Sequence, residues 1–125
     1  SSRFLNEYFG SGVQHIAFAT DDIVATAKTL RAKGVDILTI PPNYYGDLEA
    51  RVDLPAERLK ILKTNNILYD RDADGEYMQL YTRSFKDLFF FEIVERRGYK
   101  GFGAINAPIR LTAQSRAAGA LAANF

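Results

Sequence analysis

The amino-acid sequence predicts an α+β fold, with one sheet of short strands and a few short helices. An amphipathic helix pattern lies between two strand-like stretches, residues 13–20 and 35–40, and two prolines stop the second stretch. An Asp-Gly turn signal separates two further apolar stretches, and an apolar run at residues 88–95 follows. The 125 residues suffice for one domain with its own core. We expect the order strand, helix, strand, a helical insert and then three strands.

The first third of the chain is predicted to contain a leading segment, a strand and a helix. Residues 1–10 are mixed in character, and we expect one short helical turn there. Residues 13–20 alternate as strand residues do. The helix begins at Asp21 or Asp22, because a carboxylate there accepts from free backbone N–H groups, and Gly34 ends it.

The rest of the chain is predicted to hold two helices, a hairpin and a last strand. Residues 44–51 and 55–64 have the spacing of short helices. Residues 67–70 and 76–82 form the hairpin around the Asp-Gly turn. The Ala-rich tail, residues 112–125, is either a helix or a frayed end. We expect residues 1–125 to be a single module and a fragment of a larger protein.

The composition excludes several classes of function. The net charge of +1 provides no electrostatic basis for binding nucleic acid or an anionic membrane. No apolar run approaches the roughly 20 residues of a membrane span. The sequence has no phosphate-binding loop, dinucleotide fingerprint or nucleophile-elbow motif. Cysteine is absent, which rules out disulfides and thiolate chemistry and fits our expectation of a cytoplasmic protein.

Two potential metal ligands lie in strand-like stretches. His15 is the only histidine, and on its own a strand histidine is more often a satisfied core or pocket residue than a ligand. Glu92 alternates with apolar residues of the last strand, so it either replaces an apolar side chain on a buried face or faces water. One histidine and one carboxylate are two ligands, and a 2-His-1-carboxylate iron site needs three.

Other polar residues allow two interpretations each. Gln79 shares a strand face with Tyr77 and Tyr81, which suits either a polar aromatic substrate or an exposed face. Residues 70–75 resemble the start of a calcium-binding loop, but the twelfth position is Tyr81 instead of a bidentate Glu, so we expect an acidic turn. A small basic cluster follows the last strand and either binds an anion or is solvated; it comprises Arg96, Arg97 and Lys100.

Four motifs follow one another between Gly12 and Pro108: GVQHIAFATDDI, PPNYYGDLEAR, ILYDRDADGEYMQLYTR and FFFEIVERRGYKGFGAINAP. In this order they resemble the C-terminal half of the 4-hydroxyphenylpyruvate dioxygenase family, in the vicinal oxygen chelate (glyoxalase-like) superfamily. The resemblance implies a βαβββ module of the glyoxalase/dihydroxybiphenyl dioxygenase type. It also implies that His15 and Glu92 bind the metal, that Gln79 lines the pocket, and that Phe102 of a closing loop faces the substrate ring. Asn106 falls in the same loop motif.

The resemblance also implies a cofactor and partners. The cofactor would be Fe(II), or another divalent cation such as Mg, Mn or Co, and the substrate an aromatic or cyclic oxo acid. A second βαβββ module would supply the missing histidine. The ending GAINAPIRL is closer to a related group, in which a dioxygenase-like domain follows a 3-dehydroshikimate dehydratase barrel. In that alternative the module is structural or regulatory. A homo-oligomer that builds its site from two copies of His15 and Glu92 is a third interpretation.

Overall fold

A computed structural model of the chain describes residues 4–8, 14–83, 89–98, 109–114 and 116. For residues 4–8, 14, 15 and 89 the structure describes the backbone alone. Within these ranges, no helix is long and apolar enough to cross a membrane.

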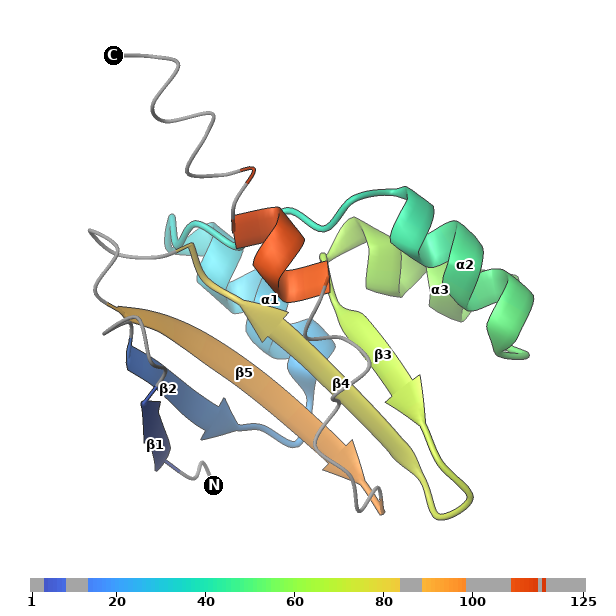
Figure 1. The fold of residues 1–125 in the computed structure, drawn as a ribbon, viewed down its shortest axis with the longest axis horizontal. Coiled ribbons are helices and arrows are strands. Elements are labelled where there is room, and N and C mark those ends of the chain that lie inside the picture. Colours follow the sequence, from blue (N-terminus) through green and yellow to red (C-terminus); the bar gives the residue numbers. More distant parts are fainter. Residues whose placement is uncertain (1–3, 9–13, 84–88, 99–108, 115, 117–125) are drawn as a thin grey trace.

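The described strands form one mixed five-stranded sheet in the order β1-β2-β5-β4-β3 (Figure 1). The central strands β2 and β5 run parallel, and the other neighbouring pairs are antiparallel. The strands are β1 (Phe4–Tyr8), β2 (Gln14–Ala19), β3 (Leu68–Arg71), β4 (Glu76–Tyr81) and β5 (Phe89–Arg97). The sheet confirms the predicted α+β class and the three final strands.

Three helices accompany the sheet: α1 (Ile23–Ala32), α2 (Asn43–Arg51) and α3 (Ala56–Thr64). Asp22 caps α1, since its side chain accepts from the Ala25 N–H at 3.0 Å. Gly34, with φ of +79°, follows the last turn of α1, as predicted. A short helix at residues 109–114 lies on the opposite side of the sheet from α1 (Figure 1).

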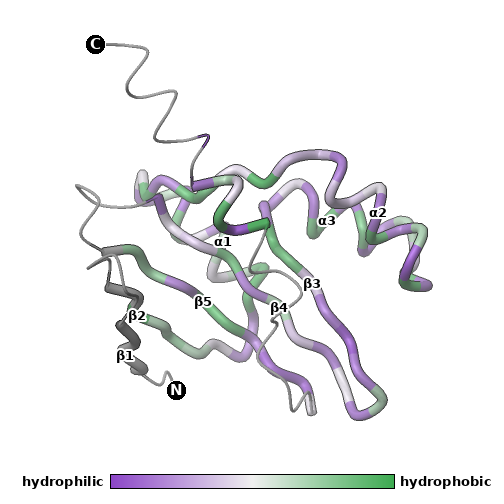
Figure 2. Tube along the Cα trace, in the orientation of Figure 1, coloured by the Kyte–Doolittle hydropathy of each residue, from purple (hydrophilic) through white to green (hydrophobic). Residues whose placement is uncertain are grey.

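The alternation of side chains gives the sheet two different faces. The α1 face carries Glu76, Met78, Leu80, Ile93 and Glu95, and it packs against the helices. The Glu92 face carries Tyr77, Gln79, Tyr81, Phe90 and Glu92. Figure 2 shows the hydrophobic run of β5 interrupted by hydrophilic positions, which these two faces accommodate. The buried carboxylates of Glu92 and Glu95, both on β5, therefore lie on opposite faces of the sheet.

Two tyrosines of α2 cover the open edge of β3. The Tyr44 hydroxyl donates to the Tyr69 carbonyl and accepts from the Tyr69 N–H, both at 2.9 Å. The Tyr45 hydroxyl donates to the Ile67 carbonyl at 3.0 Å. Backbone groups at a sheet edge need partners or they invite pairing with another chain. The helical insert thus closes this edge of the sheet.

The prediction of a helical turn in residues 1–10 is wrong. Phe4–Tyr8 form β1, which pairs antiparallel with β2. A helix of one turn has few internal hydrogen bonds to offset the cost of its nucleation, whereas an added strand pairs its backbone with an existing edge. Aromatic residues such as Phe4 and Tyr8 also favour strands.

The predicted strand at residues 35–40 reduces to one bridge, between Ile37 and Thr82. Two backbone hydrogen bonds extend it, from Leu38 N–H to the Tyr81 carbonyl at 2.7 Å and from Arg83 N–H to the Asp36 carbonyl at 3.0 Å. The two prolines that follow remove the backbone donors a longer strand would need.

The predicted acidic turn is confirmed between β3 and β4. The Asp72 side chain accepts from the N–H groups of Asp74 and Gly75, at 2.8 and 2.9 Å. This arrangement is an Asx-type turn, in which a side chain satisfies the backbone of the loop. The carboxylate has a local structural role, as expected for a turn that is not a calcium loop.

Candidate functional site

Glu92 is a buried carboxylate on the Glu92 face, with an exposed fraction of 4%. Its Oε1 atom accepts a hydrogen bond from the Gln79 amide nitrogen at 2.9 Å. The hydroxyls of Tyr77 and Tyr81 lie 3.3 and 3.5 Å from the same oxygen. These distances exceed the usual ~2.7 Å of O–H···O bonds, so the amide makes the best-formed of these three contacts. The prediction that Glu92 replaces an apolar side chain on its strand face is confirmed, and the water-facing alternative is wrong.

Gln79 is 2% exposed and connects the carboxylate to a phenol. Its amide nitrogen also contacts the Tyr81 hydroxyl. The alternative of an exposed strand face for Gln79 is therefore wrong. The β4–β5 register explains the cluster, because Tyr81 pairs with Glu92 and Gln79 is two residues away on the same face.

The tyrosine beside Glu92 stays protonated. Burial, and then the negative charge of Glu92, raise the pKa of Tyr81 well above its usual value of 10.0, and the positive charge of Arg110 opposes part of this rise. A neutral phenol can donate a hydrogen bond, which a phenolate cannot. At neutral pH the cluster therefore presents an amide donor and a phenol donor to one carboxylate.

The backbone places His15 beside this cluster. His15 pairs with Phe90 in the parallel β2–β5 register, and Ala17 pairs with Glu92. Residue positions that alternate along paired strands share one face, so His15 and Glu92 occupy diagonal positions on the Glu92 face. Glu7 of β1 pairs with His15 on the other side. We did not predict this carboxylate position, because we expected a helical turn in residues 1–10.

Arg110 is a second residue that we did not predict. It is 9% exposed, and its guanidinium carbon lies 5.4 Å from the centre of the Phe90 ring and 5.8 Å from that of Tyr81. Both distances are in the cation–π range. Arg110 lies between the last predicted strand and the Ala-rich tail, and no local pattern in the sequence indicates that it packs against this sheet.

The remaining predicted residues have different outcomes. Phe102 and Asn106 lie outside the described residues, as does Lys100. Arg96 and Arg97 do not form one cluster, because they lie on opposite faces of β5. Arg96 stacks on the Tyr77 ring at 4.5 Å, and Arg97 contacts Glu95 on the α1 face.

His15 and Glu92 are suitable ligand types for a divalent metal, but two ligands are fewer than such a site needs. An imidazole and a carboxylate are ordinary ligands for iron, manganese or cobalt. Among the described residues, however, no group of three or more His, Cys, Asp or Glu side chains is placed to hold a metal.

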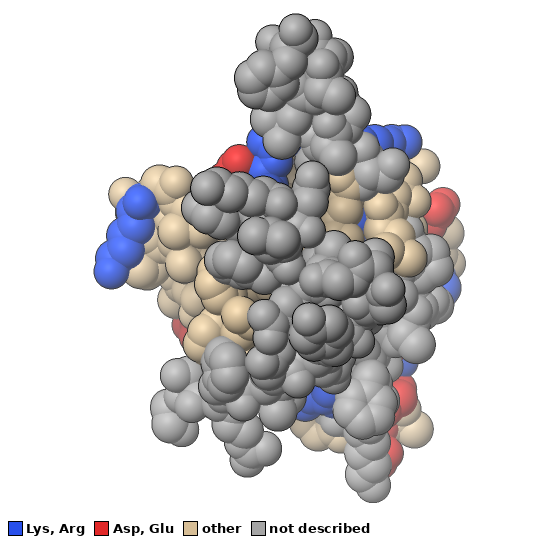
Figure 3. Space-filling view, turned by 60° about the vertical axis from the view of Figure 1, so that its left-hand side comes forward, with Lys and Arg blue, Asp and Glu red and all other residues tan. Residues whose placement is uncertain are grey.

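Charged side chains of the described surface form separate small groups in Figure 3, without a patch of one sign in that view.

Comparisons with known proteins show which proteins this chain resembles. The chain is 50% identical over 118 residues to a 3-dehydroshikimate dehydratase of Pseudomonas aeruginosa, covering 93% of the chain and 19% of the relative. It is 42% identical to a 4-hydroxyphenylpyruvate dioxygenase of the same species, covering 83% of the chain and 30% of the relative. The chain thus spans under a third of these curated relatives.

A solved structure has the same fold over most of the chain. It is a fusion of a xylose isomerase-like TIM barrel with 4-hydroxyphenylpyruvate dioxygenase, and it matches with a TM-score of 0.80 and 48% identity. The match covers 82% of this chain and 17% of that one. Residues 3–80 match the model of the Glyoxalase/Bleomycin resistance protein/Dioxygenase superfamily. The chain belongs to that superfamily.

Proposed function

We propose that the chain supplies His15 and Glu92 to a divalent-metal site of a 4-hydroxyphenylpyruvate dioxygenase-like protein. The substrate would be an aromatic or cyclic oxo acid, and a second module would contribute the remaining histidine. The observation that carries the proposal is the buried Glu92 carboxylate, diagonal to His15 on one face of paired strands. A buried carboxylate is costly unless it has a partner, and a cation at this position would offset that cost.

Each residue of the cluster has a definable task in this proposal. Gln79 holds the Glu92 carboxylate through its amide nitrogen, and Tyr81 remains a neutral donor beside it. Phe90 and Tyr81 provide an aromatic wall, with ring centres 5.9 Å apart. A bound iron(II) would bring the capacity to activate oxygen and to chelate a 2-oxo acid. Phe102 would pack on the substrate ring and help to exclude water.

The test is metal content of the protein at its full natural length, measured by elemental analysis after dialysis against Fe(II), Mn(II) or Co(II). We expect about one metal ion per site in the wild type. We expect large losses in Glu92→Gln and in His15→Ala, because each removes a ligand. Binding that is absent from the wild type, or unchanged in both variants, would contradict the proposal.

Glu95→Gln is the matched control. Glu95 is equally buried, at 3% exposure, and lies on the same strand three residues later, but on the α1 face. Its replacement should leave the metal content unchanged. A loss of metal in this control would indicate damage to the fold instead of removal of a ligand.

A second candidate function follows from the 50% identity to a 3-dehydroshikimate dehydratase. In this candidate the chain is a structural or regulatory domain behind a dehydratase barrel, and it holds a metal or a small acid without catalysing the reaction. Dehydration of 3-dehydroshikimate by the full-length protein would then survive His15→Ala, and oxygen uptake with 4-hydroxyphenylpyruvate would be absent. Substrate-dependent oxygen uptake that His15→Ala abolishes would favour the first candidate.

A further inference from the structure

The amide nitrogen of Gln79 joins oxygen atoms of two neighbouring strands. It donates to Glu92 Oε1 on β5 at 2.9 Å, and it also donates to the Tyr81 hydroxyl oxygen on β4. A primary amide has two N–H donors, so a single nitrogen can serve both oxygens. The opposite orientation of the amide would place its own oxygen against the Glu92 carboxylate, with two acceptors facing each other. These two oxygens therefore favour one orientation of the Gln79 amide.

Tyr81 is the least flexible of these three side chains. It is 3% exposed, and its ring packs edge-on against the Phe90 ring with centres 5.9 Å apart. The guanidinium carbon of Arg110 lies 5.8 Å from the centre of the same ring. A tyrosine ring is placed by two side-chain torsions, whereas glutamine and glutamate have three. Packing thus fixes the Tyr81 hydroxyl, and the longer Gln79 side chain is held against it.

The contacts of the Tyr81 hydroxyl indicate that it acts on Glu92 through Gln79. The hydroxyl oxygen lies 3.5 Å from Glu92 Oε1, beyond the usual length of a hydrogen bond, whereas its contact with the Gln79 nitrogen is close. The same nitrogen makes the 2.9 Å contact with the carboxylate. The three groups form a chain from a fixed phenol to an amide and then to a carboxylate. Hydrogen bonds in such buried chains reinforce one another.

We propose that Tyr81 is a positioning residue of the metal site: its hydroxyl fixes the Gln79 amide, and the amide fixes the direction of the Glu92 carboxylate. The inference rests on the proposed function, because it takes Glu92 as a ligand of a divalent metal. It adds that metal affinity depends on a hydroxyl outside the set of ligands. Replacing a hydrogen-bond partner of a metal ligand typically lowers metal affinity about 10–100-fold, because the ligand is no longer held in its binding orientation.

The test is Co(II) binding to the full-length protein, followed by the visible absorption of the bound ion. Tyr81→Phe removes the hydroxyl and keeps the ring, and we expect it to weaken Co(II) binding about tenfold or more and to change the absorption spectrum. Gln79→Leu should weaken binding at least as much. Adding Tyr81→Phe to Gln79→Leu should change the affinity by less than about twofold, since the chain from hydroxyl to carboxylate is already broken.

Tyr45→Phe is the matched control. Tyr45 is also 3% exposed, and its hydroxyl donates to the Ile67 carbonyl at 3.0 Å, at the edge of β3. Its replacement should lower the free energy of unfolding and keep the Co(II) affinity and spectrum of the wild type. An equal loss of affinity in Tyr45→Phe and Tyr81→Phe would indicate a general effect of lost stability and would overturn the inference.

Two further results would also overturn the inference. One is wild-type Co(II) affinity and spectrum in Tyr81→Phe. The other is full additivity of Tyr81→Phe and Gln79→Leu, which would mean that Tyr81 acts without Gln79.

Glu92→Gln separates this inference from the proposed function. Co(II) binding that Glu92→Gln abolishes and Tyr81→Phe leaves unchanged would refute only the inference. A wild type that binds no Co(II), or a Glu92→Gln variant that binds it as tightly as the wild type, would refute both.

Discussion

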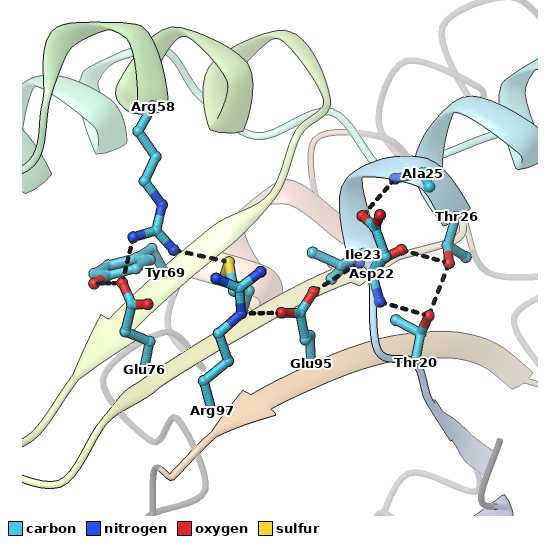
Figure 4. A network of polar contacts seen from close by, with 11 residues as sticks. Thr20, Asp22, Ile23, Ala25, Thr26, Arg58, Tyr69, Glu76, Glu95 and Arg97 are labelled. Atoms are coloured by element: carbon cyan, nitrogen blue, oxygen red, sulfur yellow. Dashed lines mark hydrogen bonds and ion pairs between the residues drawn. The ribbon is translucent and has the colours of Figure 1, made fainter. Parts of the chain in front are cut away.

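Glu95 and Glu92 are buried carboxylates on one strand, and we predict that Glu95 is structural. Its Oε1 accepts from the Ile23 N–H at 2.8 Å, at the first residue of α1. Its other oxygen contacts the Arg97 guanidinium, whose side chain is 57% exposed. Figure 4 shows these contacts beside the Asp22 cap of α1. Glu95 therefore ties the end of β5 to the beginning of α1.

The structure sets the size of the expected effect of Glu95→Ala. Leaving the Ile23 N–H without a partner costs about 1–3 kcal/mol. Losing a negative charge at a helix N-terminus costs about 0.3–1 kcal/mol. The contact with exposed Arg97 is solvent-screened and contributes about 0–1 kcal/mol. We expect a total of about 1–5 kcal/mol, or a fall in Tm of about 5–20 °C for a domain of this size.

Glu95→Gln separates the hydrogen bond from the charge. The glutamine carbonyl can still accept from the Ile23 N–H, so the expected cost is about 1 kcal/mol. Urea unfolding followed by circular dichroism measures both variants. The reasoning fails if the alanine variant loses less than about 0.5 kcal/mol, or if glutamine costs as much as alanine.

Three further predictions concern the frame around the site. Tyr44→Phe should cost about 2–4 kcal/mol in urea unfolding, because it leaves a buried carbonyl and N–H of β3 without their partner, and a cost near zero would show that water replaces the hydroxyl. Gly75→Ala should lower the free energy of unfolding by several kcal/mol or prevent folding, since its Cβ would lie 1.7 Å from a backbone oxygen at the end of β5. Gly46→Ala is the contrasting substitution, because its Cβ would meet nothing within 4 Å, and it should stabilise α2 by about 0.5–1 kcal/mol. Burial raises the pKa of Glu76, and hydrogen bonds from Arg58 and Tyr69 lower it, so that the pKa in the folded protein lies below its usual 4.5. Glu76 should therefore contribute stability above pH 4.5, and this contribution should be lost as the pH falls through the pKa of the folded state. Unfolding curves of Glu76→Gln should lack this acid-dependent part, and an unchanged pH profile would contradict the assignment.

The patterns that proved reliable in this sequence are local ones. The cap at Asp22, the glycine after α1 and the Asp-Gly turn each depend on a few neighbouring residues, and each is observed. The alternation on β4 likewise grouped Gln79 with Tyr81 on one face. Backbone geometry at a cap or turn is determined mainly by its own residues, which is why the sequence alone predicts it.

The features that the sequence could not predict depend on distant partners. Whether residues 4–8 form a strand depends on the free edge of β2, and whether residues 35–40 do so depends on the end of β4. The burial of Gln79 required knowledge of its neighbour Glu92 across the β4–β5 pairing. The position of Arg110 required knowledge of how residues 109–114 pack against Phe90 and Tyr81. Tertiary contacts override local preference at all of these positions.

The two buried glutamates of β5 show why a site can be located by sequence only in part. Glu92 and Glu95 have the same chemistry and nearly the same burial, and an odd separation of three places them on opposite faces. The neighbouring elements then decide their tasks. On the α1 face a backbone N–H of a helix satisfies Glu95, whereas on the Glu92 face an amide and two phenols surround Glu92 next to the position of His15. The described partners of Glu92 include neutral donors, whereas Glu95 already accepts from the N-terminus of α1 and contacts an arginine. We therefore expect Glu92 to bind the metal and Glu95 to stabilise the junction between β5 and α1.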